Sequence, residues 1–293
     1  RLDATNVVDP RVAVITNVDY DHQKYLGSRL EEIAMEKAGI IKPRSDAKAG
    51  PLSVVCTSDD PLVRNILEEQ CRATGARCLH ALDEARVEAE PDTLGRFRLK
   101  VSFPRGPTLD LRIPLPGEHQ VRNAVAAIRA LMVLQTEGFP IDAEDIKGGI
   151  EAAHWPGRLE LVGGDPPIIL DGAHNIAGAE SLRKYCEQFL RSKRLVLLFG
   201  LMRDKDVAEI AGKLFPLASE IVLTAAESER SAEPDWIAAQ LPEYQQRYHC
   251  TRSPQEALSV ARNLASPDGI ILAAGSLFLV GDLQRTLNLE AAA

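Results

Sequence analysis

Val12-Ala-Val-Ile-Thr-Asn-Val18 is a nearly continuous run of apolar and β-branched residues. Such a run is typical of a strand that is buried on both faces, as the strands of parallel sheets are. The polar residues Asp19, Asp21 and His22 follow directly. In open α/β sheets, ligands gather at the carboxyl ends of the strands. The stretch therefore predicts a parallel α/β sheet with a candidate ligand-binding edge.

A helix is expected after this strand. Ser28-Arg-Leu-Glu31 has the form of a capping box. Gly39 and Pro43 mark the end of the helix near Ala38, because glycine favours the C-terminal cap and proline cannot continue a helix. The elements expected next are a strand at Leu52–Thr57, a helix near Asp60–Thr74, antiparallel strands within Val87–Ile113 with a turn at Arg105–Pro107, and helices at about Gly117–Glu137 and Asp142–Ala153.

His154-Trp-Pro-Gly157 interrupts this pattern, and we expect it to separate two domains, residues 1–156 and 157–293. Beyond it, strands and helices alternate regularly. This alternation predicts an α/β fold with a doubly wound, mainly parallel sheet. The expected strands are Pro167–Leu170, Leu195–Gly200, Glu220–Thr224, Gln246–Cys250 and Gly269–Ala274, and the expected helices are Ala177–Leu190, Asp206–Phe215, Pro234–Leu241, Pro254–Ala265 and about Leu277–Leu289.

Composition excludes several classes of protein. The net charge of −8 argues against a nucleic-acid or anionic-membrane partner, which would need a basic surface. The longest apolar run, Gly269–Val280, is shorter than the roughly 20 residues of a membrane-spanning helix. The 5 cysteines are odd in number and form no C-x-x-C motif. We therefore expect neither a disulfide framework nor a zinc site, and the reducing cytoplasm is the favoured location.

Lys37 lies on the apolar side of the first expected helix. The apolar stripe begins at Leu30, includes Ile33 and Ala34, and reaches Lys37 at i+7. A lysine that faces a core is costly unless it is paired or modified, and burial favours the neutral, nucleophilic amine. The alternative is an ordinary lysine at a helix end, with its ammonium group in solvent and near the negative end of the helix dipole.

Two more groups of polar residues in the first half could bind ligands. Asp19, Asp21 and His22 offer oxygen and imidazole ligands for Mg²⁺, although a simple polar turn has the same composition. Gln120 and Asn123 are one turn apart on the apolar side of the long helix. Their amides can hydrogen-bond a purine edge, or they can cap an ordinary core helix.

In the second half, polar residues follow three of the expected strands. Asp171-Gly-Ala-His-Asn175, Asp204–Asp206 and Ser276 should lie at the same edge of one sheet, which indicates a ligand-binding face. Arg158 follows the domain boundary and is suited to bind phosphate. The alternatives are a surface ion pair for Arg158 and a helix cap for Asn175. No P-loop motif occurs, so these residues alone indicate a two-domain α/β ligand-binding protein.

Taken in order, several motifs resemble the folylpolyglutamate synthase/dihydrofolate synthase family of the Mur ligase superfamily. The resemblance covers essentially the whole chain. It implies the remainder of a P-loop-type central domain, which binds ATP, followed by a C-terminal Rossmann-like glutamate ligase domain. The matching stretches are Arg1–Val8 (RLDATNVV), Ile15–Gly27 (ITNVDYDHQKYLG), Glu31–Pro43 (EEIAMEKAGIIKP), Leu115–Ile128 (LPGEHQVRNAVAAI), Trp155–Glu160 (WPGRLE), Asp171–Asn175 (DGAHN), Gly200–Asp206 (GLMRDKD) and Ala273–Asp282 (AAGSLFLVGD).

The resemblance implies ATP-dependent ligation of L-glutamate to dihydropteroate or a reduced folate. ATP would phosphorylate a carboxylate of the acceptor, and the amine of glutamate would attack the acyl phosphate. The family uses Mg²⁺, often K⁺, and is generally monomeric. Carried over residue by residue, the resemblance implies that His22 would ligate Mg²⁺ and that Lys37 would be carbamylated and order that metal. Gln120 and Asn123 would face adenine, Arg158 would reach the ATP phosphates, and Asp171 would contact the nucleotide. His174, as a catalytic residue, and Ser276 would lie near glutamate.

The chain departs from the family pattern in several places. Ile176 stands where the family usually has proline, and Trp155 stands where phenylalanine is commoner. The Gly-rich phosphate loop of the family would precede Arg1, so we expect an N-terminally truncated chain that is inactive alone. The alternatives are another Mur ligase that acts on a UDP-linked muramyl substrate, and a non-catalytic module that binds nucleotide or glutamate. The run Glu31–Pro43 favours the folate branch.

Overall fold

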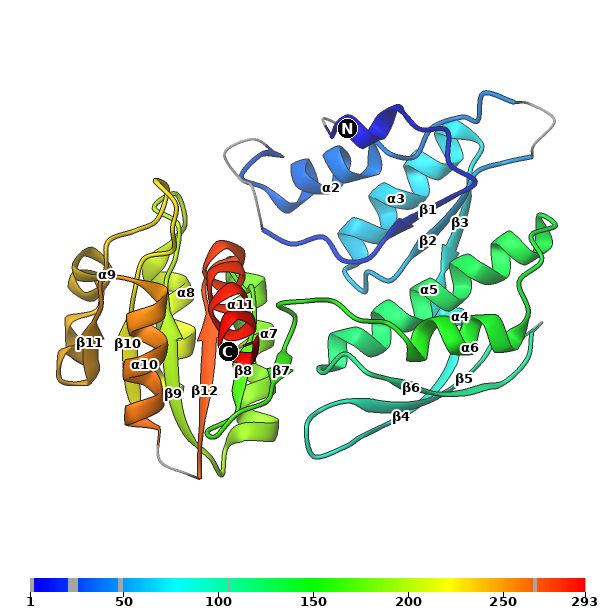
Figure 1. Ribbon diagram of the computed structural model, residues 1–293. Coiled ribbons are helices and arrows are strands. Elements are labelled where there is room, and N and C mark those ends of the chain that lie inside the picture. Colours follow the sequence, from blue (N-terminus) through cyan, green and yellow to red (C-terminus); the bar gives the residue numbers. More distant parts are fainter. Residues whose placement is uncertain (1–2, 21–25, 47–49, 105, 266–267, 293) are drawn as a thin grey trace. The chain divides into compact units, whose positions relative to one another are not determined.

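The computed structural model describes residues 3–20, 26–46, 50–104, 106–265 and 268–292, and the side chains up to residue 288. The chain forms two compact units, which are drawn in Figure 1. The first unit comprises Arg1–Asp92, Arg96–Pro114 and Glu118–Ala153, and the second comprises Thr93–Gly95, Leu115–Gly117 and His154–Ala293. Within the described residues, no helix combines the length and the apolar character needed to cross a membrane.

A parallel three-stranded sheet, in the order β1-β2-β3, forms the centre of the first unit. Helices α2 and α3 cover one face, where Ile33 and Leu67 pack against Ala13 and Val54. Helix α5 lies against the other face, on the side of Val55. The elements are η1 (Ala4–Val7), β1 (Val12–Ile15), α2 (Leu30–Ala38), β2 (Ser53–Cys56), α3 (Pro61–Thr74), β3 (Arg77–His80), α4 (Ala81–Glu84) and α5 (Glu118–Thr136).

The first unit also contains the antiparallel sheet that the sequence predicted within Val87–Ile113. Its strands β4 (Arg86–Pro91), β5 (Phe97–Ser102) and β6 (Leu109–Ile113) pair in sequential order. Apolar residues of β5 and β6 are buried at every second position, which places one face of the sheet on the core. Helix α6 (Ala143–Glu151), capped by Asp142, packs against β6.

The second unit is a doubly wound sheet in the order β11-β10-β9-β12-β8-β7, as Figure 1 shows. Alternate residues of the central strands point to opposite faces. One face packs against α7, α8 and α9, and the other packs against α10 and α11. The elements are β7 (Glu160–Val162), β8 (Ile168–Leu170), α7 (Ile176–Tyr185), η3 (Cys186–Leu190), β9 (Arg194–Phe199), α8 (Val207–Leu214), η4 (Phe215–Leu217), β10 (Glu220–Leu223), α9 (Pro234–Gln240), η5 (Pro242–Arg247), β11 (Tyr248–Cys250), α10 (Pro254–Leu264), β12 (Gly269–Ala274) and α11 (Leu277–Ala292). The predicted α/β fold is confirmed.

Two local predictions were wrong. Val14 is 41% exposed, so β1 is not buried on both faces; it pairs only with β2 among the described strands. The cap of α2 lies one residue later than expected, because Glu32 rather than Glu31 accepts hydrogen bonds from the backbone N–H groups of Ser28 and Arg29, at 2.9 and 3.1 Å. Two short strands, β3 and β7, were not predicted.

Candidate functional site

The carboxyl edge of the second sheet brings several predicted site residues together. Asp171 follows β8, and Ser276 follows β12, which is the parallel neighbour of β8. Strand β7 runs antiparallel to β8 and begins beside its carboxyl end, with Glu160 opposite Leu170. Arg158, just before β7, therefore reaches the same edge of the sheet. The sequence predicted this edge for Asp171 and Ser276 but not the strand that places Arg158 there.

The buried Asp171 carboxylate connects two loops at this edge of the sheet. Its Oδ2 accepts a hydrogen bond from the N–H of Leu159 at 2.9 Å, and its Oδ1 accepts one from the N–H of Ala173 at 2.8 Å. Burial raises the pKa of the Asp171 carboxyl, while these two N–H groups and the nearby Arg158 and His174 oppose the rise. The carboxylate thus joins the loop that carries Arg158 to the loop that carries His174.

The loop that carries Arg158 has an unusual backbone. Gly157 has a φ of 70°, and Leu159 has a φ of 46°, a left-handed conformation that residues other than glycine rarely adopt. The Glu160 carboxylate accepts hydrogen bonds from the N–H of Gly157 at 2.8 Å and from Nε2 of Gln284 at 2.6 Å. Strained backbone of this kind persists where the surrounding structure holds it, and it is common in ligand-binding loops. The half-buried Arg158 side chain is presented from this fixed loop.

His174 has a defined tautomer. Its Nδ1 lies 2.8 Å from the carbonyl oxygen of Gly172, which can only accept, so Nδ1 carries the proton. In the neutral form of the ring, Nε2 then has a lone pair that can accept a proton or a hydrogen bond. The side chain is half-buried at the end of β8. This arrangement suits a group that contacts a substrate amine.

Asn175 and Ser276 both cap helices. Asn175 Oδ1 accepts a hydrogen bond from the N–H of Gly178 at 2.7 Å, so the capping role is confirmed and α7 begins at Ile176. Ser276 Oγ accepts a hydrogen bond from the N–H of Phe278 at 3.1 Å, and the residue is 1% exposed. Ser276 therefore fixes the start of α11 from a buried position.

Lys37 lies half-buried in the last turn of α2, beside the buried Ile33, Ala34 and Ala38. The apolar stripe is thus confirmed. Within the residues that the structure describes, the Lys37 ammonium group makes no hydrogen bond or ion pair. His22, the predicted metal ligand, lies outside the described residues.

Gln120 and Asn123 differ in burial, contrary to the expectation that both lie on the apolar side of α5. Gln120 is buried, whereas Asn123 is exposed, because the buried side of the helix continues through Ala124 and Ile128. Asn123 Nδ2 donates a hydrogen bond to Gln120 Oε1 at 3.0 Å. The pair still presents adjacent amides near the start of α5, with one partner accessible.

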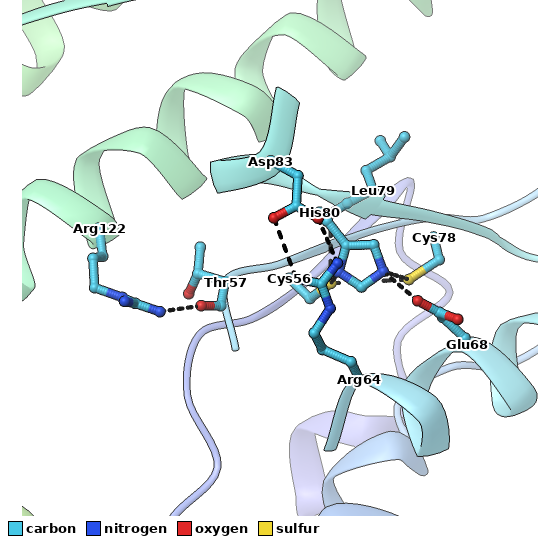
Figure 2. Close-up of polar contacts among 9 residues, drawn as sticks. All are labelled: Cys56, Thr57, Arg64, Glu68, Cys78, Leu79, His80, Asp83 and Arg122. Carbon is cyan, nitrogen blue, oxygen red and sulfur yellow. Dashed lines mark hydrogen bonds and ion pairs between the residues drawn. The ribbon is translucent and has the colours of Figure 1, made fainter. Parts of the chain in front are cut away.

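A further group of side chains in the first unit was missed from the sequence. Cys56, Cys78 and His80 bring two sulfur atoms and an imidazole nitrogen within 4.8 Å of one another (Figure 2). The expectation of no zinc site rested on the absence of a local cysteine motif, but here the ligands come from two neighbouring strands. The spacing of Cys78 and His80, two residues apart and so on one face of a strand, was the signal that could have revealed them.

Two family models match the chain. The Mur ligase middle domain matches residues 1–131, and the Mur ligase glutamate ligase domain matches residues 157–277. The chain belongs to the Mur ligase family.

The relatives and solved structures that resemble this Mur ligase chain are named as folate enzymes. It is 30% identical to the dihydrofolate synthase/folylpolyglutamate synthase of Bacillus subtilis over 98% of this chain and 65% of that protein. It is 34% identical to the folylpolyglutamate synthase of Lacticaseibacillus casei over 97% of this chain and 64% of that protein. The chain therefore spans about two thirds, slightly less, of the length of these relatives.

The structural likeness extends over both units. A Mycobacterium tuberculosis folylpolyglutamate synthase complexed with ADP and AMPPCP has a TM-score of 0.87 and 30% identity, covering 97% of this chain and 65% of that one. E. coli FolC in complex with DHPP and ADP has a TM-score of 0.84 and 26% identity, covering 99% of this chain and 64% of that one. The names of these neighbours support the folate branch over the muramyl branch.

Proposed function

We propose that this chain is part of an ATP-dependent amide ligase that joins L-glutamate to a folate or to dihydropteroate. The observation that carries the proposal is the match of both Mur ligase domains together with relatives named folylpolyglutamate and dihydrofolate synthases. Residues 1–156 would belong to the central, ATP-binding domain, and residues 157–293 would form the glutamate ligase domain. The protein would work as a cytoplasmic monomer, with K⁺ as an additional cation.

The residues at the edge of the second sheet would handle phosphate and glutamate. Arg158 would bind phosphate oxygens through its guanidinium group, because the fork of N–H donors matches them in pairs. His174 Nε2 would accept a hydrogen bond or a proton from the amine of glutamate. Asp171 would act mainly by holding both loops, since both of its oxygens already accept backbone hydrogen bonds. Ser276 would shape the glutamate side by fixing the start of α11.

In the first unit, Gln120 and Asn123 would face the adenine ring of ATP. ATP, when bound, supplies the phosphoryl group that activates the acceptor carboxylate, and Mg²⁺ neutralises charge on its phosphates. Lys37 fits a role near the metal, because it is half-buried without an acidic partner among the described residues. Carbamylation would convert its amine into an anionic oxygen donor, the kind that Mg²⁺ prefers, with His22 as a second ligand.

A phosphate-release assay tests this function in a protein that carries these 293 residues together with a phosphate-binding loop. Release of phosphate from ATP should require both L-glutamate and a dihydropteroate or tetrahydrofolate acceptor, and a UDP-linked muramyl acceptor should not replace them. Arg158→Ala should reduce ATP affinity roughly 10- to 100-fold, as expected for a charge-assisted contact of about 1.5–3 kcal/mol, whereas the exposed Arg194→Ala should not. ATP binding without glutamate-dependent phosphate release would favour the non-catalytic module. The 293-residue chain alone should release none.

A further inference from the structure

Two neighbouring strands of the first unit direct a group of soft ligands toward one point. Cys56 is the last residue of β2, and Cys78 and His80 lie two residues apart on β3, so both face the same side of the sheet. The parallel register pairs Cys56 directly with His80. Figure 2 shows the two sulfur atoms and the imidazole ring facing one another. The group lies in the first unit and includes none of the residues assigned above to ATP or glutamate.

The three side chains lie close enough together to act as ligands of one thiolate–imidazole metal site. Cys56 Sγ lies 3.9 Å from Cys78 Sγ and 3.1 Å from His80 Nδ1, and Cys78 Sγ lies 3.7 Å from His80 Nε2. Zinc bonds of about 2.3 Å to sulfur and about 2.0 Å to nitrogen place two tetrahedral ligands roughly 3.5–3.8 Å apart. One ligand atom from each residue lies within 4.8 Å of the others, so side-chain rotation of His80 and Cys78 would bring the three atoms around one ion.

A carboxylate orients the imidazole from its other side. Glu68, on α3, lies 2.8 Å from His80 Nε2. The carboxylate accepts a hydrogen bond from the Nε2–H group of the neutral ring, which leaves Nδ1 unprotonated with its lone pair toward Cys56. Metal-bound histidines commonly have such a carboxylate on the second ring nitrogen, where it fixes the tautomer and makes the ligand more basic. A simple network of thiol hydrogen bonds does not require this partner.

The charges around the group are compatible with a cation. The Glu68 carboxylate places a negative charge beside the imidazole of His80. The positive charge of the nearby Arg64 is paired with the Asp83 carboxylate, to which the guanidinium donates two hydrogen bonds.

We propose that Cys56, Cys78 and His80 bind one thiophilic cation of the Zn²⁺ class, with Glu68 as the carboxylate that positions His80. Two sulfur ligands and one nitrogen select a soft or borderline metal over Mg²⁺. Because cysteine ligands bind a metal as thiolates, binding should release protons and tighten as pH rises. The ion would join β2, β3 and, through Glu68, α3. This site is independent of the ligase function proposed above.

Cobalt titration of the reduced, metal-free 293-residue chain tests the site. Co²⁺ bound to thiolates gives near-ultraviolet charge-transfer bands, and tetrahedral Co²⁺ gives strong visible bands. We expect one equivalent of Co²⁺ to produce both and one equivalent of Zn²⁺ to abolish them. Cys78→Ser should remove about half of the charge-transfer intensity, and His80→Gln should weaken binding without abolishing the sulfur bands. Cys186→Ser, a buried cysteine of the second unit, is the control and should change nothing.

Glu68→Gln gives a second, independent readout. It leaves all three ligands in place and should weaken Co²⁺ binding roughly 10- to 100-fold, as for other carboxylates behind a metal-bound histidine. Far-ultraviolet circular dichroism of each variant checks that the chain is folded. The proposal is overturned if no charge-transfer band appears, if the band is unchanged in Cys78→Ser, or if a Cys56–Cys78 disulfide that survives reductant accounts for the close sulfurs.

Discussion

The Asp171 carboxylate holds Leu159 in its left-handed conformation through a 2.9 Å hydrogen bond from the Leu159 N–H group. The same carboxylate accepts the N–H of Ala173, on the other side of the site. One buried carboxylate therefore fixes the backbone next to both Arg158 and His174.

Asp171→Asn should destabilise the second unit by about 1–3 kcal/mol, because the amide nitrogen of asparagine would face a backbone N–H that needs an acceptor. Trp155 and Trp236 both lie in the second unit, so tryptophan fluorescence during urea unfolding reports its stability. The matched control is Asp204→Asn, which removes only an exposed ion pair with Arg230 and should change stability by less than about 0.5 kcal/mol. Equal effects of the two substitutions on stability would refute the conclusion that the Asp171 carboxylate holds both loops.

Glu180 should make the second unit more stable above pH 4.5 than at low pH. Hydrogen bonds from Arg183 and Lys213 lower the pKa of Glu180 from 4.5 to about 2. A carboxyl whose pKa is depressed by folding contributes stability above its unfolded pKa, and that contribution is lost as pH falls toward its folded pKa. The stability difference between the parent chain and Glu180→Gln should therefore shrink between pH 4.5 and about 2. Fluorescence-detected urea unfolding across this range measures it, and a constant difference would contradict the assignment.

Lys37→Ala should lower turnover of the complete ligase steeply while leaving the chain folded. The proposed carbamate forms from CO₂, so the parent protein should show a ¹³C resonance after incubation with labelled bicarbonate, and the variant should lack it. Excess bicarbonate or chloride should partly restore turnover of the variant. Lys193→Ala, which removes an exposed lysine of the second unit, is the control and should keep both signal and activity. Unchanged turnover in Lys37→Ala would eliminate the carbamate role.

Cys78 should be alkylated faster than the buried Cys186 in the metal-free chain. Hydrogen bonds from the Cys56 and Cys71 thiols hold the pKa of Cys78 below that of an ordinary thiol, so its rate should vary little between pH 5 and 8. Burial raises the pKa of Cys186 to about 12, and this residue should remain unmodified in the folded chain. Peptide mass spectrometry after timed iodoacetamide exposure follows each site separately. A Cys78 rate that rises roughly tenfold per pH unit would show an ordinary thiol instead.

Elements with strong local signals were predictable from the sequence. Helix α3 has a capping Asp60, a proline at its first position and a left-handed Gly75 at its end, and the predicted range agrees with the observed one. Strand β12 is apolar at every position and buried throughout. The residues of such elements are enough to predict them without knowledge of tertiary contacts.

The missed features depend on contacts between distant residues. Strand β3 has charged or polar residues at both ends and only Leu79 fully buried, so its sequence carries no clear strand pattern. Without β3, the approach of His80 to Cys56 could not be foreseen. The grouping of Asp171 with Ser276 was predictable because the carboxyl ends of parallel strands share an edge. The hydrogen bond to Leu159 was not, because it requires the left-handed backbone before β7.

In the proposed reaction the acceptor carboxylate is activated as an acyl phosphate, and isotope transfer from that carboxylate to phosphate is the sharpest test. The acceptor is supplied with its reacting carboxylate enriched in a heavy oxygen isotope, together with ATP and L-glutamate, to a protein that carries this chain and a phosphate-binding loop. Each phosphate released should contain one oxygen from that carboxylate, in step with amide formation. Amide formed with unlabelled phosphate would contradict it.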